Sequence, residues 1–202
     1  MIPEKKRNRY WSPPANTPRE HSNTVNRVKK IFLKEPRKFF RDKVILDAGC
    51  GWGDASRYMI VEGQAKTVIG VDVNLEALHV LKDKFKKEFE GYNLKFLERN
   101  IYDTKFDDNM FDLIVCTEVI EHMDTDELIL TIKEFKRILK KDGRVWISTP
   151  KKRFEKKNNL EGRGSHWIEY DEKEVTQLFF EYGFWVNWKD IHHDMFFMFK
   201  HL

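Results

Sequence analysis

Short apolar runs alternate with helical patterns along most of this chain, and that alternation constrains its fold more than any other feature. Five of the apolar runs are predicted to be strands, and helical patterns separate them. They are residues 44–46, 67–73, 94–97, 111–116 and 145–148. Alternation of this kind is typical of a parallel sheet that is wrapped by helices through right-handed crossovers.

The C-terminal part of the sequence departs from this pattern. Two aromatic runs, 184–188 and 195–199, are separated only by Lys189 to Asp194. That gap is too short for a crossover helix, so the two runs must pair antiparallel. The predicted fold class is therefore α/β and Rossmann-like, with a mostly parallel seven-stranded sheet, a C-terminal antiparallel hairpin and helices on both faces.

Apolar residues at helical spacing predict the helices. The first helix is expected over 21–35, and Pro36 is expected to end it. Two more are expected over 54–61 and 124–140. A further helix should begin at the capping pattern of Asp171 and Glu174 and end near Gly183. Asn74 is expected to cap a further helix, whose inward stripe is Leu75, Leu78, Leu81, Phe85 and Phe89. We expect residues 1–40 to form an arm and helix that cover the substrate site, and 41–202 to form the main domain.

A glycine loop follows the first expected strand directly. Gly49, Gly51 and Gly53 allow backbone N–H groups to approach a ligand where a Cβ would collide. Ligands of open α/β sheets bind at the carboxyl ends of the strands, which is where this loop lies. Asp72 ends the next strand 23 residues after Gly49, where its carboxylate can accept the hydroxyls of a ribose. The alternative is that the glycines only make a tight turn into a helix.

The residues around the loop discriminate between nucleoside ligands. The dinucleotide fingerprint needs a glycine where this chain has Asp54 or Ser56, which disfavours a nucleotide-dependent oxidoreductase. Asp47 would repel a pyrophosphate but suits a ligand that carries an ammonium and a sulfonium. S-adenosylmethionine has both charges and no phosphate, so it is the favoured cofactor.

At this point the sequence resembles the class I S-adenosylmethionine-dependent methyltransferases. Val44 to Gly53 looks like their first motif, Asp72 like their ribose-binding acid, and 106–112 like the segment before their fourth strand. The resemblance implies that Asn100, where the family usually has Asp, contacts the adenine amino group and that Ile101 packs on the ring. The expected cofactor-binding residues are Asp47, Gly49, Cys50, Gly51, Gly53, Asp72, Val73, Asn100, Ile101 and Thr117.

A second group of polar residues follows the fourth expected strand. If a helical turn begins there, Glu118, Glu121 and His122 share one face, and such ligands suit Mg²⁺, Mn²⁺ or Zn²⁺. The stretch resembles the quinone-precursor O-methyltransferases and the small-RNA 2'-O-methyltransferases, in which the pattern is associated with a divalent metal. Alternatively, Glu118 and His122 only hydrogen-bond to loops around the cofactor, and Glu121 is solvated.

The expected reaction is methyl transfer by an enzyme to a small-molecule acceptor at a hydroxyl. His122 and His166 are the candidate bases, because imidazole titrates near neutral pH. The basic loop 150–166 indicates either an anionic acceptor or an ordinary solvated loop. An RNA ribose methyltransferase and a non-catalytic methyltransferase-like subunit are the alternatives; no aromatic and basic platform for RNA is evident.

The overall composition fits these expectations without selecting a substrate. A net charge of +4, from 37 basic and 33 acidic residues, permits an anionic partner but does not require one. Two cysteines support neither a disulfide framework nor a zinc pair. Since no signal peptide or membrane span is evident, we expect a cytoplasmic protein, and nothing in the sequence indicates an oligomeric state.

Overall fold

The structure, a computed structural model, describes residues 36–79, 81, 90–151, 168, 170–191 and 194–202. The expected arm, first helix and most of the basic loop lie outside these residues. Seven strands form one sheet. They are β1 (Val44–Ala48), β2 (Thr67–Asp72), β3 (Leu94–Glu98), β4 (Phe111–Thr117), β5 (Leu139–Pro150), β6 (Phe184–Ile191) and β7 (Asp194–His201).

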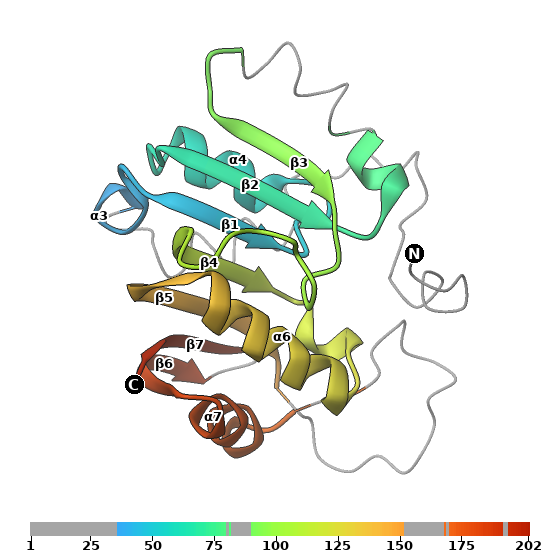
Figure 1. Cartoon of the computed structure of the whole chain (residues 1–202), viewed down its shortest axis with the longest axis vertical. Coiled ribbons are helices and arrows are strands. Elements are labelled where there is room, and N and C mark those ends of the chain that lie inside the picture. Colours follow the sequence, from blue (N-terminus) through green and yellow to red (C-terminus); the bar gives the residue numbers. More distant parts are fainter. Residues whose placement is uncertain (1–35, 80, 82–89, 152–167, 169, 192–193) are drawn as a thin grey trace.

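The sheet has the order β3-β2-β1-β4-β5-β7-β6. Strands β1 to β5 are parallel, while β7 lies between β5 and β6 and pairs antiparallel with both (Figure 1). The predicted parallel sheet with a C-terminal antiparallel hairpin is therefore confirmed, although both hairpin strands are longer than expected.

Each strand of the sheet contributes to two cores, because successive side chains point to opposite faces. On β1, Ile45 joins the core under helix α4 (Asp54–Val61), and Leu46 joins the core under helices α6 (Thr125–Ile138) and α7 (Glu172–Glu181). Both side chains are fully buried. Helices therefore cover both faces of the sheet, and the carboxyl ends of β1 to β5 meet at one edge (Figure 1).

The capping patterns seen in the sequence form as expected. Asp124 caps α6 in a capping box with Glu127, and Asp171 caps α7 in a second box with Glu174. Asn74 Oδ1 accepts the backbone N–H of Ala77 at 3.1 Å and so caps the next helical segment. Among the described residues, no helix is long and apolar enough to cross a membrane.

Several boundaries differ from the prediction. Pro36 is the first residue of helix α3 (Pro36–Phe40), where a proline loses no intrahelical hydrogen bond, and the helix expected over 21–35 lies outside the described residues. Leu139 belongs to β5 rather than to α6, and Asp142 and Gly143 lie inside β5, where its register with β4 shifts. β5 therefore begins six residues earlier than the predicted strand over 145–148.

The helix after Asn74 has a narrower buried stripe than predicted. Leu78 and Leu81 are buried together with Ala77, whereas Leu75 is exposed. Phe85 and Phe89 lie outside the described residues.

Candidate functional site

The glycine loop connects β1 to α4 at the carboxyl edge of the sheet. Gly49, Gly51 and Gly53 all have positive φ, at 74°, 49° and 71°, a conformation that side chains disfavour. A Cβ on Gly49 would lie 2.4 Å from Cγ2 of Val119, whereas a Cβ on Gly51 would meet no atom of the described residues within 4 Å. The loop is therefore closed toward the protein at Gly49 and open at Gly51, as a ligand-binding loop requires.

Hydrogen bonds to strand β2 hold the first part of this loop. The backbone N–H groups of Gly49 and Cys50 both donate to the carbonyl oxygen of Val71, at 2.9 and 3.0 Å. The Cys50 side chain packs into the core under α4, and burial raises the pKa of its thiol well above the usual value. Cys50 therefore offers the site no reactive thiolate, and its backbone N–H and carbonyl oxygen hold the loop through Val71 and Gly53.

Asp72 lies at the end of β2, directly beside the loop. Its Oδ2 accepts the N–H of Gly51 at 2.8 Å, and its Oδ1 accepts the N–H of Asn74 at 2.8 Å. Burial raises the pKa of Asp72, although these backbone hydrogen bonds oppose the shift. An ionised carboxylate has about four acceptor positions, so Asp72 keeps capacity for a hydroxyl donor. Val73 follows it and is half-buried.

Asp47 lies beneath the loop rather than at its surface. Its carboxylate is 1% exposed and accepts the hydroxyl of Ser56, on α4, at 2.5 Å. Burial raises the pKa of Asp47 to about 7. The full negative charge that the sequence argument assumed is therefore not present throughout the neutral pH range, and a nearby cation would be needed to favour the ionised form.

The segment that follows β3 completes this end of the site. The N–H of Arg99 donates to the carbonyl oxygen of Asp72 at 3.1 Å, which ties the start of the segment to β2. Asn100 Oδ1 accepts the N–H of Tyr102 at 3.1 Å, and the Ile101 side chain is 5% exposed. The structure thus places Asn100 and Ile101 just past the end of β3, the strand that pairs with β2 up to Asp72.

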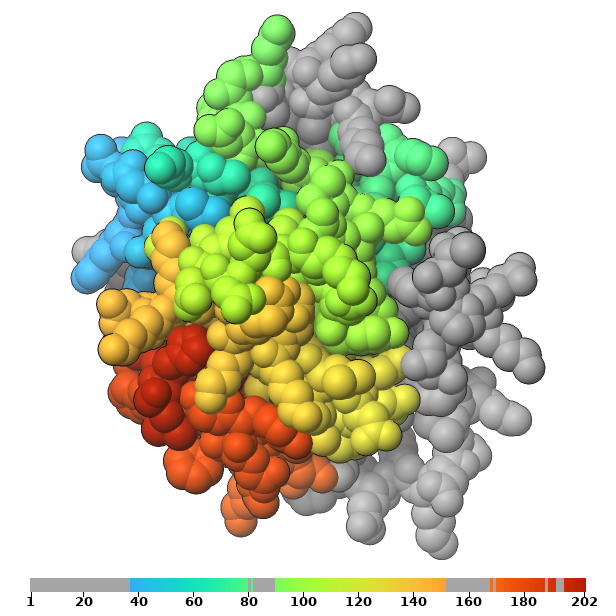
Figure 2. All heavy atoms as spheres, in the orientation of Figure 1, coloured from blue at the N-terminus to red at the C-terminus, as the bar shows by residue number. Residues whose placement is uncertain are grey.

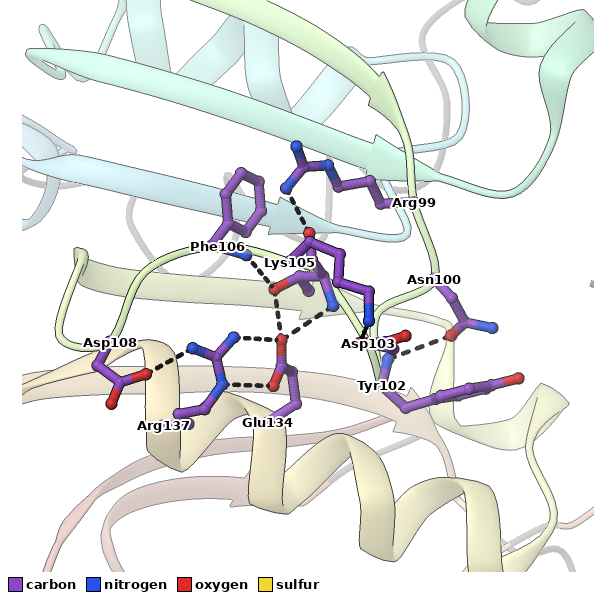
Figure 3. Close-up of polar contacts among 10 residues, drawn as sticks. Arg99, Asn100, Tyr102, Asp103, Lys105, Phe106, Asp108, Glu134 and Arg137 are labelled. Atoms are coloured by element: carbon purple, nitrogen blue, oxygen red, sulfur yellow. Dashed lines mark hydrogen bonds and ion pairs between the residues drawn. The ribbon is translucent and has the colours of Figure 1, made fainter. Parts of the chain in front are cut away.

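A polar cluster that the sequence did not predict fixes the same segment onto α6 (Figure 3). Glu134 Oε1 accepts both the N–H and the hydroxyl of Thr104, and Arg137 donates to both carboxylate oxygens of Glu134. Arg137 also forms an ion pair with Asp108 at 2.6 Å. In the space-filling view this segment and α6 form one continuous surface (Figure 2).

The expected metal ligands do not form one cluster. Glu118 lies before the turn with φ 56°, and only Ile120–His122 is helical, as a 3₁₀ turn. Ser148 donates to Glu118 Oε1 at 3.0 Å, and Thr149 donates to Glu121 Oε2 at 3.1 Å, both from the end of β5. Within the described residues, no group of three or more His, Cys, Asp or Glu side chains is arranged to hold a metal ion.

The expectation that these three side chains share one helical face is therefore wrong. The alternative that Glu121 is solvated is also wrong, since Glu121 is 1% exposed. Thr117, at the end of β4, is buried, and His122 is half-buried beside the same edge of the sheet. His166 lies outside the described residues, but the N–H of Ile168 donates to the carbonyl oxygen of Glu121, so the chain returns to this edge just after it.

Comparison with known proteins identifies similar chains. Residues 45–143 match a family described as a methyltransferase domain. A ubiquinone biosynthesis O-methyltransferase of Actinobacillus pleuropneumoniae serotype 5b is 30% identical over 145 residues, which are 69% of this chain and 58% of that protein. A tRNA U34 carboxymethyltransferase of Campylobacter fetus is 32% identical over 109 residues, which are 54% of this chain and 37% of that protein.

Solved structures share the fold at low sequence identity. Magnesium protoporphyrin IX methyltransferase from Synechocystis PCC 6803, solved with bound SAH, has a TM-score of 0.72 against this chain. It is 18% identical, and the match covers 97% of this chain and 92% of that one. The curated relatives are longer proteins, and this chain spans 58% to 61% of the length of the first three.

Proposed function

The chain belongs to the class I S-adenosylmethionine-dependent methyltransferases, and from this premise we propose that it transfers the methyl group of S-adenosylmethionine to a hydroxyl of a small-molecule acceptor. The observation that carries the cofactor assignment is the contact between Asp72 and the open glycine loop. Its carboxylate accepts the N–H of Gly51, and its carbonyl oxygen accepts the N–H of Arg99, the residue before Asn100. A ribose on Asp72 would place the base over the end of β3.

The proposed reaction is a direct displacement at the methyl carbon. An acceptor oxygen attacks that carbon in line with the carbon–sulfur bond, which breaks with its electron pair on sulfur and leaves S-adenosylhomocysteine. Positioning supplies most of the acceleration in such a reaction. The hydroxyl proton passes to a base, for which His122 and His166 remain the proposed residues.

The nature of the acceptor is supported by the relatives. The first four curated relatives are all ubiquinone biosynthesis O-methyltransferases, which favours a hydroxyl on a small molecule. The similarity to a tRNA U34 carboxymethyltransferase favours RNA as the second candidate acceptor. A non-catalytic subunit is the remaining alternative, and the loop geometry that would bind cofactor argues against it.

Two measurements test the proposal. Calorimetry with S-adenosylmethionine and with NAD should show binding of the first only, and Asp72→Ala should abolish it. Asp142→Ala is the matched control, because Asp142 is an exposed carboxylate in β5 away from the loop. Tighter binding of NAD, or unchanged affinity in Asp72→Ala, would contradict the cofactor assignment.

Transfer of a labelled methyl group to catechols, hydroxy acids and small RNAs would then identify the acceptor class. Label in a small phenol or alcohol supports the proposal, and label in RNA alone supports the second candidate. Cofactor binding without transfer to any acceptor would favour the non-catalytic alternative.

A further inference from the structure

The side chain of Arg99 closes the turn that follows β3. Its Nη1 donates to the carbonyl oxygen of Thr104, further along the chain. Within the turn, the N–H of Asp103 donates to the carbonyl oxygen of Asn100 at 3.1 Å. The guanidinium of Arg99 therefore joins the two ends of the turn, residues 99–104.

A ring that the core holds fixes the same guanidinium. Its central carbon lies 4.4 Å from the centroid of the Phe106 ring, in a cation–π contact (Figure 3). The Phe106 ring packs edge-on against Phe111, the fully buried first residue of β4, with their centroids 5.1 Å apart. Arg99 is half-buried, so its head group is held between a backbone acceptor and an aromatic ring.

The backbone of Arg99 connects the turn to strand β2. Its N–H donates to the carbonyl oxygen of Asp72 at 3.1 Å, and the Asp72 carboxylate accepts the N–H of Gly51. Arg99 therefore bonds through its backbone to the proposed ribose-binding residue and through its side chain to the far end of the turn. A substitution that truncates the side chain removes the second bond and leaves the first in place.

We propose that Arg99 is a positioning residue for the cofactor, which holds the turn so that Asn100 and Ile101 can contact the base while Asp72 binds the ribose. This inference rests on the proposed cofactor function. In this role Arg99 acts through the turn and not by contact with the cofactor. A loosened turn must be ordered again when the base binds, so loss of the guanidinium weakens binding of the base and leaves binding of the rest of the cofactor unchanged.

Two ligands that differ at the base separate this role from a general loss of stability. S-ribosylhomocysteine carries a hydroxyl where S-adenosylhomocysteine carries adenine. Arg99→Met keeps the apolar part of the side chain. In this variant the dissociation constant of S-adenosylhomocysteine should rise about tenfold, and that of S-ribosylhomocysteine should change less than about twofold. Arg99→Lys, which keeps a cationic donor, should recover part of the loss. Displacement of labelled S-adenosylmethionine from the whole chain measures both constants.

Arg144→Met is the matched control. Arg144 is also half-buried, and its Nη1 donates to Sδ of Met198 at 3.6 Å, but it lies in the first half of β5, away from the carboxyl edge of the sheet. Neither dissociation constant should change in this variant. Equal weakening of both compounds in Arg99→Met, or unchanged binding of S-adenosylhomocysteine, overturns the inference.

A second variant and a second measurement cover the remaining outcomes. If Arg99→Met does not fold, Phe106→Leu decides, because it removes the ring that the guanidinium contacts; an unchanged ratio of the two constants then overturns the inference. If S-ribosylhomocysteine does not displace the label even from the unsubstituted protein, hydrogen exchange of the amides 100–103 decides. Exchange should be faster in Arg99→Met than in Arg144→Met, and equal exchange overturns the inference. Failure of the proposed function is distinct, since the unsubstituted protein then does not bind S-adenosylhomocysteine.

Discussion

Glu134 Oε1 on helix α6 accepts two hydrogen bonds from Thr104, one from its backbone N–H at 2.9 Å and one from its hydroxyl at 2.5 Å. Thr104 is fully buried, and it ends the short segment that begins with Asn100 and Ile101. Helix α6 therefore holds the segment whose first residues are proposed to contact the base.

Removing the Thr104 hydroxyl should weaken both the fold and cofactor binding. Thr104→Val keeps the side-chain shape but leaves the Glu134 carboxylate one donor short, so the free energy of unfolding should fall by about 1–2 kcal/mol. The affinity for S-adenosylhomocysteine should fall severalfold, because the segment is less firmly held. Urea denaturation and calorimetry measure these effects. Thr176→Val, which removes a hydroxyl on α7, should not alter affinity; equal losses in both variants would contradict the prediction.

Glu134 should also make stability depend on acid pH. Burial raises the pKa of Glu134, but hydrogen bonds from Arg137 and Thr104 outweigh it and hold the pKa below its ordinary value. Because the pKa is lower in the folded state, ionisation of Glu134 stabilises the fold at any pH above the pKa of the unfolded state, near 4.5. This stabilisation is lost as the pH falls through the pKa of the folded state. Glu134→Gln should therefore be less stable than the unsubstituted protein at pH 7, and the difference should shrink on acidification below pH 4.5. A difference that is constant with pH would exclude this assignment.

Asp47 should produce the opposite dependence. Burial raises its pKa from 3.8 to about 7, so the folded state holds a proton that the unfolded chain releases. That contribution is complete below about pH 4 and is lost as the pH rises through 7. Asp47→Asn imitates the protonated form and can still accept the Ser56 hydroxyl. Relative to the unsubstituted protein, the variant should gain stability between pH 5 and pH 8, as measured by urea denaturation. No gain would show that Asp47 is ionised throughout.

The glycine loop should respond differently at its two ends. Gly49→Ala places a Cβ against Val119 at positive φ and should cost at least about 2 kcal/mol of stability. Val119→Ala should recover part of that loss by removing the colliding methyl groups. In Gly51→Ala the new Cβ meets no atom among the residues that the structure describes. The substitution should cost about 1 kcal/mol of backbone strain while weakening cofactor binding more than tenfold. Equal effects of the two alanines on stability would contradict the closed and open ends described above.

The parts of the fold that follow from local pattern were predictable from sequence. Only six residues separate the two C-terminal strands predicted from the sequence. That length excludes a crossover helix, which is enough to predict the antiparallel hairpin. Asp72 and the glycines also follow from spacing along consecutive elements. By contrast, Thr104 and Glu134 are 30 positions apart and no sequence motif links them. Their hydrogen bonds can therefore be recognised only in the folded structure.

The predicted shared helical face of Glu118, Glu121 and His122 failed for a similar reason. It assumed that Glu118 begins a regular helical turn, but Glu118 has positive φ, which an i, i+3, i+4 spacing cannot reveal. The hydroxyls of Ser148 and Thr149 that bind Glu118 and Glu121 come from β5, far along the chain. Local spacing identified residues at the correct edge of the sheet but not the directions of their side chains.

The insertion of β7 between β5 and β6 has a consequence for synthesis on the ribosome. While β6 is already outside the exit tunnel but β7 is not, β5 presents its hydrogen-bonding edge to whatever is nearby, and β6 has no route into the sheet. Phe197 and Phe199 fill the core under α7 only after β7 docks. A nascent chain stalled before residue 194 should therefore be captured by chaperones and cut by proteases far more readily than the finished one.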